Sequence, residues 1–347
     1  MARLLQQPPV THVASLPFGS PLASRTADAK TPKDWVRSTI RLLFQGHSFY
    51  RSPVRFGALL WALAVNLKSQ VEILRLLALR PFQELIRLDP IFPFKYLTRG
   101  YLVSDLLPSE RAACFVHHYR CLQANLPALI LQQVLYREAV LLEKEVNGRC
   151  LSVHLSLARS EVREGELMLV LRVDGVDTYY LQFTIVPGGI VKSDAADVIM
   201  ISRLQGMKGC YDEIRLATKV FREIAPPALL LAVLHGIAQL CGIDQMAGVS
   251  AASQFCFDEQ SAESFQSAYD NFWVELGAER ISRTFFLSSI PPVEKSLESV
   301  GNGHKSRTRK KREMKKQIAD DVFHLLLGTR RDQLHSLVTE EVFAEHI

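Results

Sequence analysis

The stretch GELMLVLRVDGVDTYYLQFTIV, residues 165–186, decides the fold class. It holds two runs rich in aliphatic, β-branched and aromatic residues on either side of Asp174-Gly175, a dipeptide typical of a tight hairpin turn. The preceding run LSVHLSL (151–157) alternates apolar and polar side chains, which predicts a strand with one buried face. The following run DVIMISRL (197–204) alternates in the same way. The four segments predict an antiparallel meander.

Beyond the meander, the pattern predicts a crossover to a parallel strand. A short helix is expected over 212–223, a longer helix over 228–241, and a strand over 244–251. A connection that contains a helix is the usual way to join parallel neighbours in a sheet. A further helix over 261–277 and a last strand over 280–289 complete an α+β domain with a mixed, mainly antiparallel sheet and flanking helices.

The part of the chain before the meander has a helical pattern. Within it, LPALILQQVLYREAVLLEKEV (126–146) places its aliphatic residues at spacings that gather on one face of a helix. We therefore expect a helical N-terminal unit over 32–147, packed on an α+β domain over 148–290. A basic segment and a C-terminal helix are expected over 291–347. Residues 1–31 contain scattered prolines and no continuous apolar segment, so we expect a disordered leader and no secretory signal.

The composition limits the classes of protein that the chain can represent. Of its 347 residues, 48% are hydrophobic and 22% are charged, which is typical of a globular protein. The longest apolar runs are shorter than the about 20 residues that cross a bilayer, so no transmembrane helix is expected. The six cysteines include no CxxC pair, which predicts neither a metal site nor a disulfide framework and fits a reducing cytoplasm.

The net charge of +5 comes from one segment. HKSRTRKKREMKK (304–316) holds eight Lys/Arg against one Glu, whereas the rest of the chain has 33 basic and 35 acidic residues. This distribution predicts a local electrostatic contact with an anionic lipid or an acidic protein. Nucleic acid ranks third, because the segment has no interleaved aromatic residues and no recognition motif. The basic residues that we expect to make the contact are Lys305, Arg307, Arg309, Lys310, Lys311 and Arg312.

Several stretches of the chain stand out together: RGYLVSDLLPSERAACFVHHYRCL (99–122), EGELMLVL (164–171), YYLQFTIV (179–186), ISRLQGMKG (201–209), IRLATKVF (214–221), PPALLLAVLHGIAQLCGIDQMAGVS (226–250), YDNFWVELG (269–277) and KSRTRKKRE (305–313). In this order they resemble the VirK/YbjX family of bacterial proteins, and the resemblance extends over roughly residues 35–325. The resemblance implies a role in virulence, envelope integrity or tolerance of antimicrobial peptides. It implies no agreed biochemical activity. A cytoplasmic protein, peripheral at the inner membrane, fits both the resemblance and the basic segment.

A second resemblance concerns the C-terminal half alone. YDEIRLATKVF (211–221), followed by 226–250, looks like the acyltransferase (GNAT) fold that N-acetyltransferases share with acyl-homoserine-lactone synthases. In the synthases, a Glu and an Arg stand in a comparable context, which is matched here by Glu213 and Arg215. This resemblance implies an enzyme that uses acyl-CoA or an acyl carrier protein, with these two residues as catalytic candidates.

The loop before this helix is a candidate phosphate-binding loop. Acetyltransferases bind the pyrophosphate of the acyl carrier with backbone N–H groups in an Arg/Gln-x-x-Gly-x-Gly/Ala loop at a helix start. Here Arg203, Gln205, Gly206 and Lys208 are the candidate cofactor-binding residues, although Lys208 stands where the pattern needs a small residue. The alternative is that Gly206 and Gly209 only turn the chain out of the last meander strand.

The sequence HHY (117–119) lies in an expected helix and supplies a candidate general base. Imidazole titrates near neutral pH, and we take His118 as the candidate. The alternative is a histidine packed between helices beside a second one that faces solvent. Two functions follow: a non-enzymatic binding factor, or an acyltransferase-like enzyme. A separation of strands 197–204 and 244–251 beside a pocket bordered by 205–215 would favour the enzyme.

Overall fold

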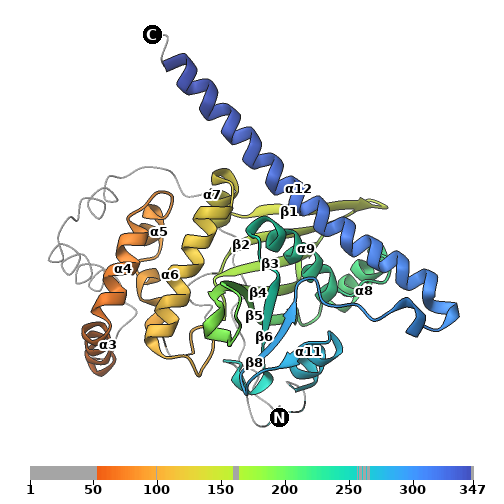
Figure 1. Cartoon of the computed structure of the whole chain (residues 1–347), viewed down its shortest axis with the longest axis horizontal. Coiled ribbons are helices and arrows are strands. Elements are labelled where there is room, and N and C mark those ends of the chain that lie inside the picture. The colour runs from red at the N-terminus through yellow and green to blue at the C-terminus, as the bar shows by residue number, and fades with distance from the viewer. Residues whose placement is uncertain are drawn as a thin grey trace.

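The structure is a computed structural model that describes residues 53–98, 100–158, 164–255, 257, 260, 263 and 266–344. The expected disordered leader over 1–31 lies outside these residues. Figure 1 shows short helices on one side of a twisted sheet and one long helix that crosses the molecule. The helical side consists of α3 (Pro53–Val65), α4 (Leu67–Leu77), α5 (Gln83–Leu88), the 3₁₀ helix η2 (Phe92–Leu97), α6 (Pro108–Asn125) and α7 (Ala128–Tyr136). The architecture is α+β, as predicted.

Within the described residues, eight strands form one mixed sheet in the order β1-β2-β3-β4-β5-β6-β8-β7. Only β5 and β6 are parallel neighbours. The strands are β1 (Ala139–Val146), β2 (Arg149–Leu157), β3 (Leu167–Val173), β4 (Val176–Pro187), β5 (Asp197–Gly206), β6 (Gln245–Val249), β7 (Glu279–Arg280) and β8 (Phe285–Ser289). The meander and the hairpin turn at Asp174-Gly175 are confirmed, and both turn residues have positive φ.

The prediction of one helix over 126–146 is wrong. Helix α7 ends at Tyr136, and β1 follows as a fifth meander strand paired with β2. The register shifts between Val140 and Leu142, where a bulge displaces the alternation of side chains by one residue. Because of the bulge, the sequence does not show the regular alternation of apolar and polar residues expected of a strand. The adjacent residues Leu141 and Leu142 fit a helix as well as a strand.

The crossover between parallel strands is confirmed. Strand β5 is followed by α8 (Tyr211–Val220), then by α9 (Pro226–Cys241) and β6. Helix α9 begins with two prolines, whose fixed φ suits a first turn, and ends at Gly242 with φ 68°. Eleven of the sixteen residues of α9 are buried, so this helix is a central part of the core.

The end of the sheet differs from the expected single strand over 280–289. Residues Glu279–Arg280 form β7 and pair with the middle of β8, so the segment is a short hairpin. The Ser282 hydroxyl accepts hydrogen bonds from the backbone N–H groups of Thr284 and Phe285 and stabilises the turn between the two strands. The helix expected over 261–277 is described as a π-helix, η6 (Gln266–Asp270), that continues into α11 (Asn271–Glu275).

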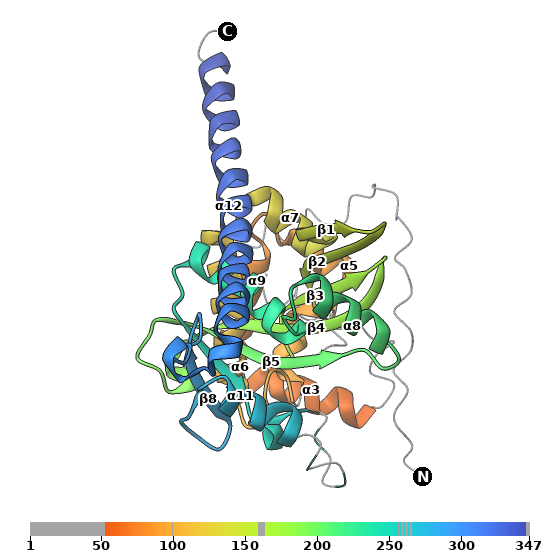
Figure 2. The same ribbon diagram turned by 90° about the vertical axis from the view of Figure 1, so that its right-hand side faces the viewer.

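Helix α12 (Lys305–Ala344) contains both the basic segment and the expected C-terminal helix. Its middle part packs on α9, with Ile318, Ala319 and Val322 buried, and Figure 2 shows the two helices side by side against the sheet. Gly236 of α9 makes this approach possible, because a Cβ there would lie 2.6 Å from the Ala319 carbonyl oxygen. None of the helices in the described ranges has the length and hydrophobicity needed to span a bilayer.

Candidate functional site

The loop after β5 places the predicted phosphate-binding residues at the end of a strand. Gly206 is the last residue of β5 and is paired with Tyr179 of β4. A Cβ on Gly206 would lie 3.1 Å from the Tyr179 ring and 3.2 Å from the Ile214 side chain. The positive φ in this loop belongs to Gly209, at 90°. Close packing therefore favours glycine at position 206, whereas the positive φ of the turn favours glycine at position 209.

Arg203 and Gln205, two of the candidate cofactor-binding residues, bind each other. The Arg203 guanidinium donates to the Gln205 side-chain oxygen at 2.8 and 3.1 Å and to the Glu164 carboxylate at 3.0 Å. It also lies over the Tyr180 ring, 5.8 Å from the centroid. Lys208 is exposed. The charge of Arg203 is thus compensated within the protein, and Lys208 is the exposed cation of the loop.

The candidates Glu213 and Arg215 lie on the first turns of α8. Asp212 and Glu213 make this first turn acidic, and the Arg215 side chain is 83% exposed and pairs with Asp212 at 3.6 Å. Two carboxylates at a helix N-terminus oppose the binding of a pyrophosphate there. His118 is fully buried, so it does not share a site with the exposed Arg215.

His118 completes the hydrogen bonding of the sheet. Strand β3 begins opposite Phe183, so the following residues of β4 have no partner from β3. The Nδ1 atom of His118, on α6, accepts a hydrogen bond of 3.0 Å from the Ile185 backbone N–H. Burial, together with the nearby Lys95 charge, lowers the pKa of His118 to about 3. A neutral, enclosed imidazole of this kind favours a structural role over that of a general base.

A buried charged cluster, consisting of Lys95, Glu166, Tyr101 and Tyr119, lies beside His118. The Lys95 ammonium is 3.1 Å from the Glu166 carboxylate, and neither side chain is exposed. Tyr101 donates to the same carboxylate at 2.5 Å, and Tyr119 donates to its second oxygen. Burial and the Glu166 charge raise the pKa of both phenols. Through Glu166, which directly precedes β3, the cluster joins η2 and α6 to the sheet.

The other side of α6 carries a second polar cluster, formed by His117, Cys121 and Asp197. The His117 Nε2 atom is 2.6 Å from Asp197 Oδ1, and Cys121 Sγ is 3.6 Å from the same nitrogen and 3.5 Å from the same oxygen. The side chains of His117 and Asp197 are 27% and 36% exposed. Burial and the Asp197 charge raise the pKa of the Cys121 thiol to about 12.

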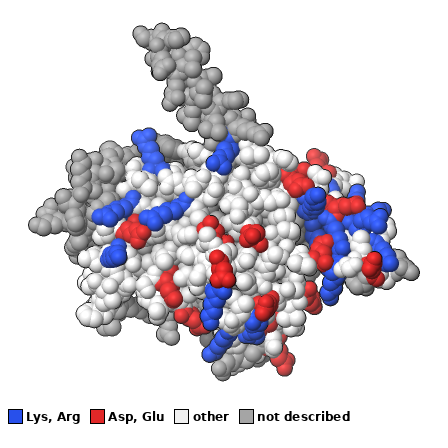
Figure 3. Space-filling model, viewed as in Figure 1, with Lys and Arg blue, Asp and Glu red and all other residues white. Residues whose placement is uncertain are grey.

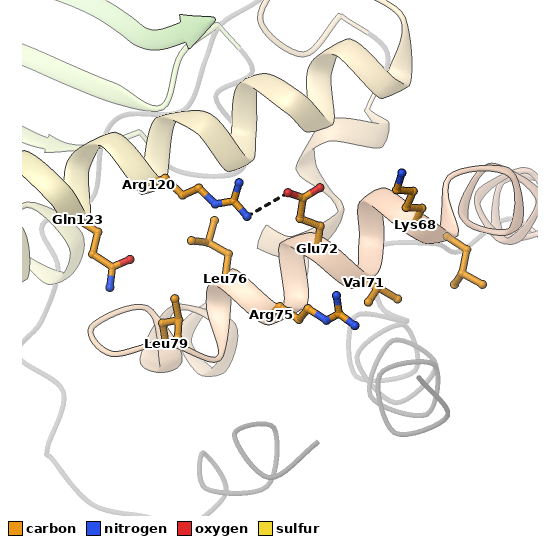
Figure 4. Close-up of a pocket in the computed structure, with 9 residues that line it drawn as sticks. Lys68, Val71, Glu72, Arg75, Leu76, Leu79, Arg120 and Gln123 are labelled. Carbon is orange, nitrogen blue, oxygen red and sulfur yellow. Dashed lines mark ion pairs between the residues drawn. The ribbon is translucent and has the colours of Figure 1, made fainter. Parts of the chain in front are cut away.

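A groove of about 860 Å³ lies between α4 and α6 (Figure 4). An ion pair of 3.0 Å between Arg120 and Glu72 crosses from one helix to the other. The groove combines aliphatic and charged side chains, and none of the site residues predicted from the sequence lies in it. Its lining residues are Leu67, Lys68, Val71, Glu72, Arg75, Leu76, Leu79, Arg120 and Gln123.

The sequence analysis missed both clusters on α6. The spacing of His117 and Cys121, four residues apart in an expected helix, indicates that the two side chains share one face. Asp197 is remote in sequence, and no local pattern connects it to them. Lys95 and Glu166 are also far apart in sequence, and a buried ion pair between distant residues produces no periodic pattern in the sequence.

The fold and these clusters define an α+β protein in which a helical unit is joined to a mixed sheet by a buried ion pair. The family described as "Protein of unknown function (DUF535)" matches residues 54–324. The chain belongs to this family, which is the VirK/YbjX family. No curated protein and no solved structure gives a significant match.

Proposed function

We propose that this DUF535 protein is a non-enzymatic binding factor that supports virulence, envelope integrity or tolerance of antimicrobial peptides. It acts in the cytoplasm and binds the inner membrane peripherally through the start of α12. The observation that carries the proposal is a group of exposed cations, Arg309, Lys310 and Lys316, which we call the basic face.

The basic face points away from the body of the protein. At about 100° per residue, Arg309 and Lys316 lie on the side of α12 opposite to Ile318 and Val322, which are buried against α9, and Lys310 projects sideways from the helix. The three cations have no ion-pair partner within the part of the chain that the structure describes. Figure 3 shows Lys and Arg gathered at the end of the molecule where α12 begins, with Asp and Glu between them.

Other cations of the same segment hold the helix in place. Arg307 pairs with Glu223 at 3.0 Å, and Arg312 pairs with Glu294 at 2.6 Å. Lys315 also pairs with Glu294. The segment is thus divided into residues that fix α12 to the body and residues that remain free for an external anion.

An anionic membrane fits the basic face better than an acidic protein does. Protein interfaces usually contain aromatic or aliphatic anchors that fill pockets on the partner. The basic face has none, since its neighbours on the same side of the helix are Ser306, Glu313 and Gln317. Lipid headgroups need only charge, at about 1 kcal/mol for each Lys or Arg near the surface.

Co-sedimentation with vesicles tests the proposal. Wild-type protein should bind vesicles that contain phosphatidylglycerol more tightly than neutral phosphatidylcholine vesicles, and binding should weaken as salt is added. Combined substitution of the basic face, Arg309→Gln, Lys310→Gln and Lys316→Gln, should reduce binding and its salt dependence. The matched control removes three exposed charges from the helical unit, Arg75→Gln, Arg80→Gln and Arg137→Gln. Equal loss in both variants, or binding that ignores lipid charge, would refute the basic face as the binding site.

A second candidate is an acyltransferase-like enzyme, and one feature of the sheet favours it. Parallel pairing of β5 with β6 covers only Ile199–Ile201, so Ser202–Gly206 continues without a partner on that side. The acyltransferase resemblance requires the two strands to separate beyond their paired part, and the short pairing is the feature that favours it. Two features count against this function. The first turn of α8 is acidic and would repel a phosphate group, and Arg203 is already bound to Gln205 and Glu164. Calorimetric titration with a panel of acyl-CoA and acyl carrier protein donors tests it, and the absence of binding by any donor would exclude it.

A further inference from the structure

The cluster of His117, Cys121 and Asp197 brings three different ligand atoms to one point. All three atoms lie within 4.8 Å of one another. His117 and Cys121 come from successive turns of α6, and Asp197 is the first residue of β5, where it is paired with Pro187 of β4. A helix face and a strand in the sheet therefore fix the positions from which the ligand atoms approach.

The distances fit a tetrahedral metal ion. Zinc bonds of about 2.3 Å to sulfur and about 2.0–2.2 Å to nitrogen and oxygen give tetrahedral edges of about 3.6 Å from sulfur to either atom. The Cys121 sulfur is 3.6 Å from the His117 nitrogen and 3.5 Å from the Asp197 oxygen. Only the edge between His117 and Asp197, at 2.6 Å, must lengthen by about 0.8 Å to reach the nitrogen–oxygen edge of such a site.

The same distances do not fit a nucleophilic triad. In a triad, the nucleophile and the acid contact opposite nitrogens of the imidazole, so that the acid orients the ring and the other nitrogen takes the proton. Here the Cys121 sulfur and the Asp197 oxygen both approach Nε2 of His117. Convergence on one nitrogen leaves no path for proton transfer from sulfur through the ring to the carboxylate. It is the arrangement expected when one cation replaces the protons that the three groups share.

We propose that His117, Cys121 and Asp197 bind one divalent cation of the zinc class, with a fourth position open to solvent. The set of one nitrogen, one sulfur and one oxygen suits this borderline cation better than it suits Mg²⁺ or Ca²⁺, which prefer oxygen ligands. The partial exposure of His117 and Asp197 gives the ion access and leaves room for a water molecule. The bound ion joins α6 to the start of β5.

Metal titration of the untagged, full-length protein tests the site. After treatment with a chelator, the protein should bind one Zn²⁺ per chain in competition with a chromophoric chelator. With Co²⁺ in its place, it should show the absorption of a tetrahedral ion and a thiolate-to-cobalt charge-transfer band. Cys121→Ser should remove that band, and Asp197→Asn should weaken binding by more than the about 10–100-fold typical for loss of an outer partner of a metal ligand.

Two other cysteines provide matched controls. Cys150→Ser, on β2, should leave affinity and spectrum unchanged. Cys241 lies at the end of α9, near enough to raise the pKa of Cys121, but it is not one of the three convergent groups. Cys241→Ser should therefore change the affinity less than twofold, and a loss equal to that of Cys121→Ser would refute the open fourth position.

Thermal melts give a second readout that does not depend on the spectrum. Zn²⁺ should raise the melting temperature of the wild type and of Cys150→Ser but not that of Cys121→Ser. Failure of the wild type to bind Zn²⁺ stoichiometrically would overturn the proposal, as would equal binding by wild type and Cys121→Ser. Circular dichroism of each variant shows whether it is folded. If a variant is unfolded, the titration of the wild type still decides whether the protein binds Zn²⁺.

Discussion

Lys95 and Arg309 carry the same charge in opposite surroundings. Lys95 lies in the buried charged cluster, where it is 3.1 Å from Glu166 and also donates to the carbonyl groups of Ala158 and Gly165. Arg309 lies on the basic face, exposed and without a partner among the described residues. The comparison shows that a buried charge is committed to the fold, because only groups of the protein replace the water that it loses on burial. An exposed charge keeps its water and remains available for binding.

The largest effect is expected from breaking the buried pair. Glu166→Leu leaves the Lys95 ammonium without its counterion and should lower the free energy of unfolding by about 3–5 kcal/mol in chemical denaturation. Adding Lys95→Met should recover much of the loss, since no unpaired charge then remains. The control is Glu84→Leu, which removes an exposed ion pair with Arg87 and should cost about 1 kcal/mol or less. A Glu166→Leu variant as stable as this control would contradict the contrast between buried and exposed charges.

A smaller effect is expected in the loop after β5, which lies between these extremes. Gly206→Val would press against the Tyr179 ring and Ile214, and should lower the free energy of unfolding by about 1–3 kcal/mol. Lys208→Ala changes only an exposed side chain and should leave the melting temperature unchanged. If Gly206→Val melts like the wild type and abolishes binding of an acyl donor, the loop is a binding site and not a packed turn.

His118, which lies beside the buried charged cluster, predicts a dependence of stability on pH. The folded pKa of His118, about 3, lies below the unfolded value of about 6.5, so its contribution is present above pH 6.5 and is lost as the pH falls towards 3. Between pH 7 and pH 5 this loss amounts to about 2 kcal/mol. His118→Asn keeps an acceptor for Ile185 N–H but does not titrate, so its denaturation curves should lack this part of the pH dependence. The exposed His304→Asn should retain it.

Much of the sheet could be predicted from the sequence because its signals are local. The Asp174-Gly175 turn and the alternation in β2 and β5 each depend on neighbouring residues alone. Strand β1 was missed, although Asn147-Gly148 between β1 and β2 is a strong hairpin signal and both residues have positive φ. The bulge interrupts the alternation of apolar and polar residues in β1, so the turn dipeptide indicates the strand better than the alternation does.

The candidate sites were harder to predict because they depend on contacts between distant segments. Arg203 and Gln205 lie two residues apart on β5, so they share one face of the strand and bind each other. Asp197 meets His117 across 80 positions, and Lys95 meets Glu166 across 71. Only the arrangement of α6, η2 and the sheet brings these groups together.

The smallest effect on stability is expected on the basic face itself. The combined change Arg309→Gln, Lys310→Gln and Lys316→Gln removes no described contact and should alter the free energy of unfolding by less than about 0.5 kcal/mol. Glu294→Gln, in contrast, weakens the contact that holds Arg312 and Lys315, and should cost about 0.5–1 kcal/mol because these ion pairs are partly exposed. Measured side by side in urea at low and high salt, the two variants separate binding charges from anchoring charges. A basic-face variant that unfolds more easily than Glu294→Gln would show that its cations stabilise the fold, and the division of the segment into two sets would then be wrong.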